Sequence, residues 1–140
     1  MFTRRRGTAI VDTPRGVLVV RERDNMFSLP GGGADGSEHR EQAAIRELRE
    51  ETGLETLGCR FLFEHQGRRR KSHHGGFYRD DHKVFLLTTA GTPRPYGEVT
   101  EVAYTDGSAP DLEPTAREII ERYLATTDAP PTSGDGPGRL

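Results

Sequence analysis

Residues 31–54 read GGGADGSEHREQAAIRELREETGL, and the prediction of the fold starts from this stretch. The three consecutive glycines at 31–33 cannot continue a helix or a central strand, so they predict a loop with unusual backbone angles. Ser37 is the predicted N-cap of a helix, and Glu38 follows it in the first turn, where the helix dipole favours acids. Gly53 stands where a helix commonly ends. The stretch therefore predicts a loop, a helix and a second loop.

The end of the predicted helix gathers acidic side chains. With Glu47 at the origin, Glu50 and Glu51 fall at about 300° and about 40°, so three carboxylates project into one arc of about 100°. Like charges three or four residues apart destabilise a helix by a few tenths of a kcal/mol per pair. A divalent cation would compensate, and Mg²⁺ prefers a few carboxylates, its own waters and the phosphate oxygens of a substrate. Arg46 can pair with Glu50 four residues later and so fix the orientation of that carboxylate.

The glycines ahead of the helix add a second signal. They allow the backbone to approach a ligand closely, and the N–H groups at the start of a helix favour phosphate. Each feature alone has a simpler interpretation, because exposed helices are often rich in Glu and Arg and the sequence Pro-Gly-Gly often marks only a turn. Together they indicate a site for a metal–phosphate ester.

The flanking segments predict a sheet covered by helices. Strands are predicted over residues 7–12, 17–21, 59–64, 84–88 (beginning as early as residue 77) and 99–105. The first two are joined by the turn residues 13–16 and so resemble a hairpin. A second helix is predicted over 114–125, where apolar residues recur on one stripe at helical spacing. This order of elements predicts an α/β or α+β fold.

Length and composition indicate one domain over residues 1–126 of the 140. Residues 127–140, with three prolines and three glycines, predict a disordered tail. The only cysteine, Cys59, excludes an internal disulfide framework and a cysteine-rich zinc site. No apolar run approaches the roughly 20 residues of a membrane span, and no apolar stretch follows the basic N-terminus as in a secretory signal. The net charge of −2 gives no argument for a nucleic-acid polymer as partner, so we expect a cytoplasmic protein.

A known motif fits the central stretch without a gap or a substitution. Its fixed positions are Gly32, then after five residues Glu38, then after seven residues Arg46-Glu47-Leu48, and then Glu50-Glu51 and Gly53-Leu54, each pair after one residue. This pattern is the Nudix box, and the chain resembles the MutT-like Nudix hydrolases. The resemblance implies an α/β/α sandwich around a mixed central sheet, in which the box forms a loop–helix–loop motif within one Nudix domain.

The resemblance also implies a reaction. The matching metal ligands are the carbonyl of Gly31 and the carboxylates of Glu47, Glu50 and Glu51, with Mg²⁺ as the cofactor and Mn²⁺ as a substitute. Arg46 and Glu38 match residues that orient the others. The implied reaction is the attack of water on a phosphorus of a diphosphate linkage in a nucleoside diphosphate joined to another group. The general base is Glu51 or Glu50, or an acid on a later loop, Glu98 or Glu101; the later pair equally fits ordinary surface acids.

One segment outside the motif is relevant to the choice of substrate, namely the four basic residues Arg68, Arg69, Arg70 and Lys71. Four consecutive cations can bind a phosphate-rich substrate, or they can simply be a solvated loop. The binding interpretation favours a dinucleoside or inositol polyphosphate, and the chain faintly resembles that branch of the family. A further alternative is a non-catalytic domain that senses a nucleotide, but such domains usually lose box glutamates and all are present here. Many relatives are dimers, so a homodimer stays open.

Overall fold

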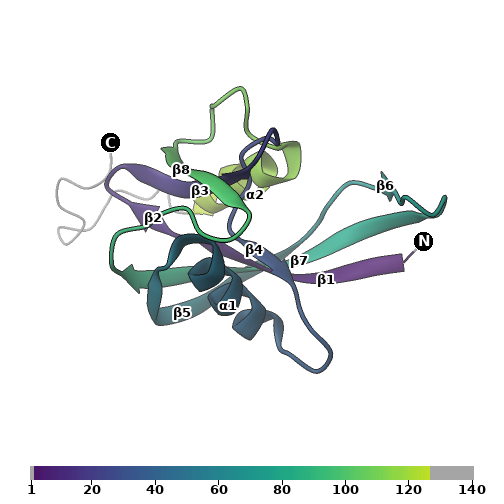
Figure 1. Cartoon of the computed structure of the whole chain (residues 1–140), viewed down its shortest axis with the longest axis horizontal. Coiled ribbons are helices and arrows are strands. Elements are labelled where there is room, and N and C mark those ends of the chain that lie inside the picture. The colour runs from purple at the N-terminus through teal and green to yellow at the C-terminus, as the bar shows by residue number, and fades with distance from the viewer. Residues whose placement is uncertain (1, 127–140) are drawn as a thin grey trace.

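Two β-sheets form the centre of the structure, a computed structural model that describes residues 2–126 (Figure 1). The larger sheet has the strand order β4-β1-β7-β5, with β6 paired to β7 outside this path. Its strands are β1 (Phe2–Ile10), β4 (Gly31–Gly33), β5 (Glu55–Gln66), β6 (Arg70–Lys71) and β7 (Phe77–Ala90). The smaller sheet, in the order β2-β3-β8, consists of β2 (Asp12–Thr13), β3 (Gly16–Glu22) and β8 (Val99–Thr105). Because β1 is parallel to β7 and antiparallel to β4, the larger sheet is mixed.

The two helices, α1 (Arg40–Thr52) and α2 (Pro114–Thr126), cover opposite faces of this sheet. Neighbouring residues of a strand point to opposite faces, and β1 shows the consequence. Ala9 packs in one hydrophobic cluster with Ala44 and Leu48 of α1, whereas Ile10 packs in another with Ile119 of α2. This arrangement confirms the predicted α+β class and the α/β/α sandwich with a mixed central sheet.

The predicted hairpin between residues 7–12 and 17–21 is present only next to its turn, where Asp12 pairs with Val17 and the N–H of Leu18 donates to the carbonyl of Val11 at 2.9 Å; over residues 7–10 it is wrong. β1 pairs with β4 and β7 in the larger sheet, and only the two residues of β2 pair with β3. The physical reason lies in the consecutive buried residues Ala9, Ile10 and Val11. A strand that is apolar on both faces is typical of the middle of a covered sheet, whereas a half-exposed hairpin strand alternates apolar and polar residues.

The glycines at 31–33 form β4 instead of the predicted loop. They pair antiparallel with Arg6, Gly7 and Thr8 of β1. β4 has only three residues and lies at the edge of the sheet, where a glycine-rich segment can pair on one side only. Gly31 has a φ of 150°, which L residues rarely adopt. The expectation of unusual backbone angles therefore holds at Gly31, while the expectation of a loop does not.

Helix α1 begins two residues later than the sequence predicts. Its N-cap is His39 rather than Ser37, and the side chain of Gln42 accepts a hydrogen bond from the backbone N–H of His39 at 3.1 Å. The end of the helix is as predicted, because Gly53 is left-handed (φ 76°) and its N–H donates to the carbonyl of Arg49 at 2.8 Å. The predicted loop–helix–loop is therefore a short edge strand, a loop, a helix and a glycine stop.

The described part of the chain ends with α2. The tail that the sequence predicts to be disordered, 127–140, lies outside it. Within residues 2–126, neither helix is long and apolar enough to cross a membrane.

Candidate active site

An open cleft of about 670 Å³ lies between α1, β4 and the loop before β8. Its walls carry the carboxylates of Glu22, Glu47, Glu50, Glu51 and Glu98. The backbone of β4 forms one side, and Arg6 is the one cationic side chain among the lining residues of the described chain. A cleft with this many acids and so little compensating charge favours a bound cation.

The three box carboxylates have different surroundings. Glu51 is the most enclosed, and burial raises its pKa to about 8 although it accepts a hydrogen bond from the N–H of Gly31 at 3.1 Å. Burial also raises the pKa of Glu47, and the neighbouring Glu50 raises it further. Glu50 is exposed and accepts a hydrogen bond from Arg46 at 3.1 Å. The helix thus presents all three to the cleft, as its geometry predicts. Glu47 and Glu50 both approach Nη1 of Arg46, at 3.6 and 3.1 Å, whereas Glu51 turns to the backbone of β4.

The donor set fits a hard divalent cation. Among residues 2–126, no three Asp, Glu, His or Cys side chains stand close enough, as they are, to hold a metal ion. Two of the box carboxylates nevertheless have raised pKa values, and a nearby cation would lower them again. All the acidic donors are oxygens, which suit Mg²⁺ and Mn²⁺ better than zinc or copper.

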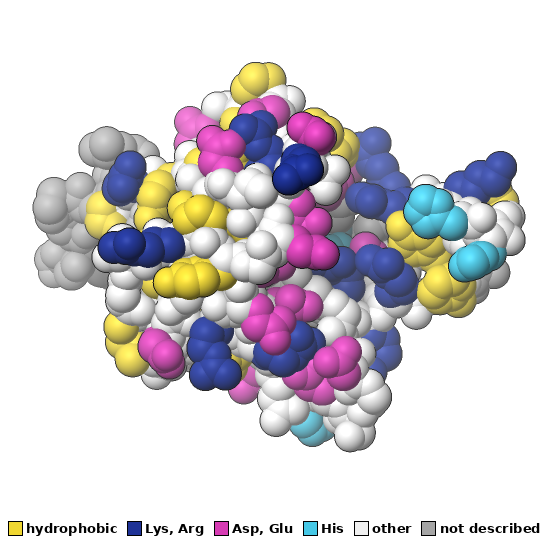
Figure 2. Space-filling model, in the orientation of Figure 1, with side chains coloured by type: hydrophobic (Ala, Val, Ile, Leu, Met, Phe, Trp, Pro, Cys, Tyr) yellow, Lys and Arg dark blue, Asp and Glu magenta, His cyan; other side chains and the backbone are white. Residues whose placement is uncertain are grey.

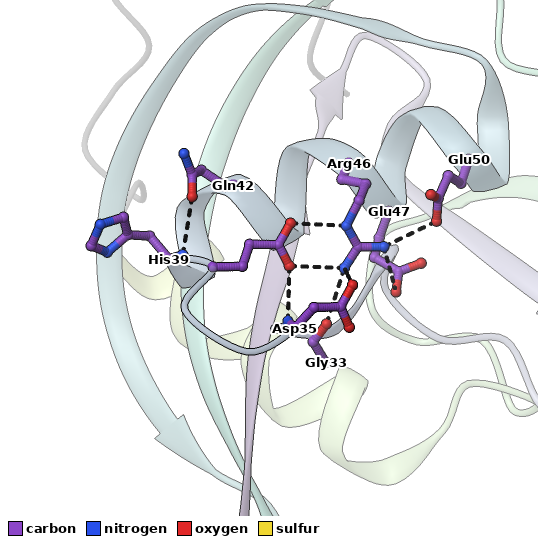
Figure 3. Close-up of polar contacts among 8 residues, drawn as sticks. Gly33, Asp35, His39, Gln42, Arg46, Glu47 and Glu50 are labelled. Atoms are coloured by element: carbon purple, nitrogen blue, oxygen red, sulfur yellow. Dashed lines mark hydrogen bonds and ion pairs between the residues drawn. The ribbon is translucent and has the colours of Figure 1, made fainter.

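Arg46 is the centre of a group of polar contacts beside the cleft (Figure 3). Its guanidinium donates to both carboxylate oxygens of Glu38, at 2.9 and 3.0 Å, to the carbonyl of Gly33 at 3.1 Å and to Glu50. The hydrogen bond from Arg46, helped by one from the N–H of Asp35, lowers the pKa of Glu38 to about 2. The predicted Arg46–Glu50 pair is therefore present, and the same arginine ties the helix to β4 and to the loop between them.

Gly32 leaves room for the carboxylate of Glu47. A Cβ atom at position 32 would lie 1.9 Å from Oε2 of Glu47. We expect Gly32→Ala to push this flexible side chain aside and to lower the hydrolytic rate about ten- to a hundredfold, as the loss of support for a metal ligand does. Steady-state kinetics and a thermal melt on the same sample check this, because the fold is expected to remain.

Gly58→Ala is the matched control, because a Cβ atom there would meet only Thr88, at a van der Waals distance of 3.7 Å, and Gly58 does not line the cleft. A Gly32→Ala variant that is folded and as active as the wild type would contradict the assigned position of Glu47.

The two later acids have different positions. Glu98 lines the cleft with the box glutamates, on the loop just before β8. Glu101 lies on β8 outside the cleft, where it pairs with Arg21. The structure therefore brings Glu98, and not Glu101, to the carboxylates of α1.

Only half of the basic segment is a strand, because Arg68 and Arg69 lie in the loop between β5 and β6. Arg70 and Lys71 form β6 and pair with Tyr78 and Phe77 of β7. Arg69 stacks on the ring of Phe77, with its guanidinium carbon 4.5 Å from the ring centre, and Lys71 is exposed. Arg68 and Arg70 instead line a second cavity of about 380 Å³ beside the cleft, enclosed by β1, β7 and α2. Only two of the four predicted cations thus face a cavity.

The residues of the cleft that were not predicted from the sequence include Arg6, Glu22 and Tyr96. Tyr96 donates its backbone N–H to the carbonyl of Glu51 at 3.1 Å and its ring covers Gly53, so it holds the loop of Glu98 against the end of α1. A signal for Arg6 does exist, because alternation along β1 places it on the same face as Arg4 and Thr8. That signal is readable only when the strand is known to extend back to residue 2.

Comparisons with known proteins agree with this description. The NUDIX domain family model matches residues 1–126. The crystal structure of a nudix hydrolase family member from Chromobacterium violaceum is 36% identical, has a TM-score of 0.75, and the match covers 95% of this chain and 84% of that one. Among curated proteins there is no significant match.

Two more distant structures share the fold. MutT NUDIX hydrolase from Burkholderia pseudomallei is 20% identical with a TM-score of 0.70, over 85% of this chain and 96% of that one. The NUDIX domain of Shewanella oneidensis NrtR, solved in complex with ADP ribose, is 18% identical with a TM-score of 0.67, over 89% and 88% of the two chains.

Proposed function

The chain belongs to the Nudix family and is a Nudix-type hydrolase, and we propose that it is a Mg²⁺-dependent pyrophosphohydrolase of nucleoside diphosphate derivatives. The observation that carries this proposal is the cleft in which an unbroken Nudix box presents its glutamates beside an arginine-lined cavity. A diphosphate in the cleft and a nucleoside in the cavity fit the chemistry of the two spaces.

The cation would be held by Glu47, Glu50 and Glu51 together with the carbonyl of Gly31, and Mn²⁺ would be the natural substitute for Mg²⁺. When bound, such a cation lowers the pKa of water and neutralises charge on phosphoryl oxygens. Arg46 would keep Glu50 oriented through the ion pair described above.

Three carboxylates are the candidates for the general base that takes the proton of the attacking water. Glu51 and Glu50 are the candidates on α1, and Glu98 is the candidate on the loop before β8. Glu101 ranks behind these three, because it lies outside the cleft and its carboxylate is paired with Arg21.

A second candidate function moves the same chemistry to dinucleoside or inositol polyphosphates. The observation that favours it is that Arg68 and Arg70 line the cavity. Arg68 already pairs with Glu118 of α2 at 3.1 Å, and Arg70 pairs with Glu113, just before α2, at 3.4 Å. These ion pairs weaken this alternative. A polyphosphate bound by several cations should lose affinity steeply as ionic strength rises, and a substrate bound by its base should not.

The test is a substrate panel with Mg²⁺, with Mn²⁺ and with a chelator. It includes deoxynucleoside triphosphates, ADP-ribose, sugar nucleotides, dinucleoside polyphosphates and inositol pyrophosphates; ADP-ribose is included because it is the ligand of the Shewanella domain. We expect metal-dependent cleavage of one nucleoside diphosphate class. Cleavage of polyphosphates alone would favour the second candidate, and no cleavage by folded protein that binds nucleotide would favour a sensing role.

A further inference from the structure

The cleft and the cavity meet at Arg6. Of the described cationic side chains, Arg6 is the one that lines both spaces. In Figure 2, Lys and Arg side chains gather around the hollow to the right of centre, next to a group of Asp and Glu side chains. A substrate that reaches from the glutamates into the cavity therefore passes the guanidinium of Arg6.

The four arginines that line the cavity differ in how closely each one is paired with a carboxylate. Three of the four hold a carboxylate: Arg4 pairs with Asp80 at 2.8 Å, Arg68 with Glu118 at 3.1 Å, and Arg70 with Glu113 at 3.4 Å. Arg6 reaches only Asp80, at 3.9 Å from its Nη1, and Asp80 is already taken by Arg4. Arg6 is thus the cavity arginine with the longest ion pair, and its charge also acts to lower the pKa values of Glu47 and Glu51 in the cleft.

One donor of Arg6 has no partner at all among the described residues. Its Nε atom is buried and makes no hydrogen bond, although the side chain as a whole is 22% exposed. A buried donor without an acceptor is unfavourable, and such a group in a native fold calls for an explanation such as an absent ligand. An anion between the cleft and the cavity would meet the exposed part of the Arg6 side chain, and it would supply the acceptor for Nε once the side chain turns toward it.

The backbone holds Arg6 in place from both sides. It pairs with Gly33 of β4 on one side and with His82 of β7 on the other. The next residue, Gly7, packs directly under α1, so β1 lies close against the helix that carries the glutamates. This pairing fixes the backbone from which the side chain extends, and the guanidinium offers a planar fork of donors that matches a phosphate.

We propose that Arg6 binds the substrate phosphate that lies between the carboxylate cleft and the cavity, and so fixes the diphosphate relative to the box glutamates. This inference rests on the proposed function, because it assumes that the two spaces hold one diphosphate ester. It adds a phosphate-binding residue outside the Nudix box.

The test measures binding of methylene diphosphonate, a diphosphate analogue that cannot be hydrolysed, by calorimetry in the presence of Mg²⁺. We expect Arg6→Gln to weaken its binding about ten- to a hundredfold, the effect of losing charge-assisted hydrogen bonds. Arg6→Lys keeps the charge without the fork, so an intermediate loss is expected. Arg5→Gln is the matched control, because Arg5 is the exposed neighbour on the same strand and lines a different cavity.

The outcomes separate the two claims. If the wild type binds the diphosphonate and Arg6→Gln, folded by its thermal melt, binds it equally well, the role of Arg6 is refuted and the proposed function stands. If the wild type neither binds the diphosphonate nor cleaves any compound of the panel, the proposed function fails and the inference with it. Equal losses in Arg6→Gln and Arg5→Gln would show a general charge effect and would also refute a specific role of Arg6.

Discussion

Glu51→Gln is expected to lower the rate of hydrolysis by several orders of magnitude while the protein stays folded. Glu51 is the most enclosed carboxylate of the cleft and sits at the end of the helix that presents the whole box. Glutamine has the same size, and its carbonyl oxygen can still accept the hydrogen bond from Gly31. The substitution therefore removes the charge that would hold the cation or take a proton, and little else. The measurement is kcat on the substrate that the panel identifies, with a thermal melt of each sample.

Glu41→Gln is the control for this prediction. Glu41 is an acid in the first turn of the same helix and lies outside the cleft. It should keep normal turnover, so a loss in both variants would point to the helix rather than to the site. Near-normal rates in Glu51→Gln would show that this helix does not carry the catalytic carboxylates.

The acidic face of α1 could be predicted from the sequence because helical geometry depends only on residue spacing. The same spacing placed Arg46 within reach of Glu50, where the structure has it. What spacing could not predict was the direction of each carboxylate tip. Glu51 turns to the backbone of β4 and Glu50 to Arg46, and these choices depend on neighbours that come into contact only in the fold.

The pairing of β1 was the main error of the prediction from sequence. Its cause is that the partner strand lies far from β1 along the chain. β1 lies parallel to β7, so Arg6 stands beside His82, which follows it by 76 positions. A short turn such as 13–16 predicts a hairpin locally, but nothing local predicts a parallel partner so far away. Arg6 was missed for the same reason, because its role depends on β4 and β7 flanking it in one sheet.

Gly7→Ala is expected to produce the largest loss of stability. A Cβ atom at position 7 would lie 2.0 Å from the carbonyl oxygen of Arg40 and 2.7 Å from the backbone nitrogen of Ala44, both in α1. Backbone atoms of a helix cannot move aside as the end of a side chain can, so α1 must shift as a body. We expect a loss of about 3 kcal/mol or more in the free energy of unfolding, and a fall in Tm of roughly 10 °C.

Gly33→Ala is the control for stability, because a Cβ there meets nothing closer than the carbonyl oxygen of Arg5 at 4.0 Å. The comparison by thermal and denaturant unfolding separates the close approach of α1 from a general effect of replacing glycine in a strand. A Gly7→Ala variant as stable as the wild type would mean that α1 is not seated on β1. Because α1 carries Glu47 and Glu51 while β1 carries Arg6, the contact at Gly7 also sets how near the box glutamates come to that arginine.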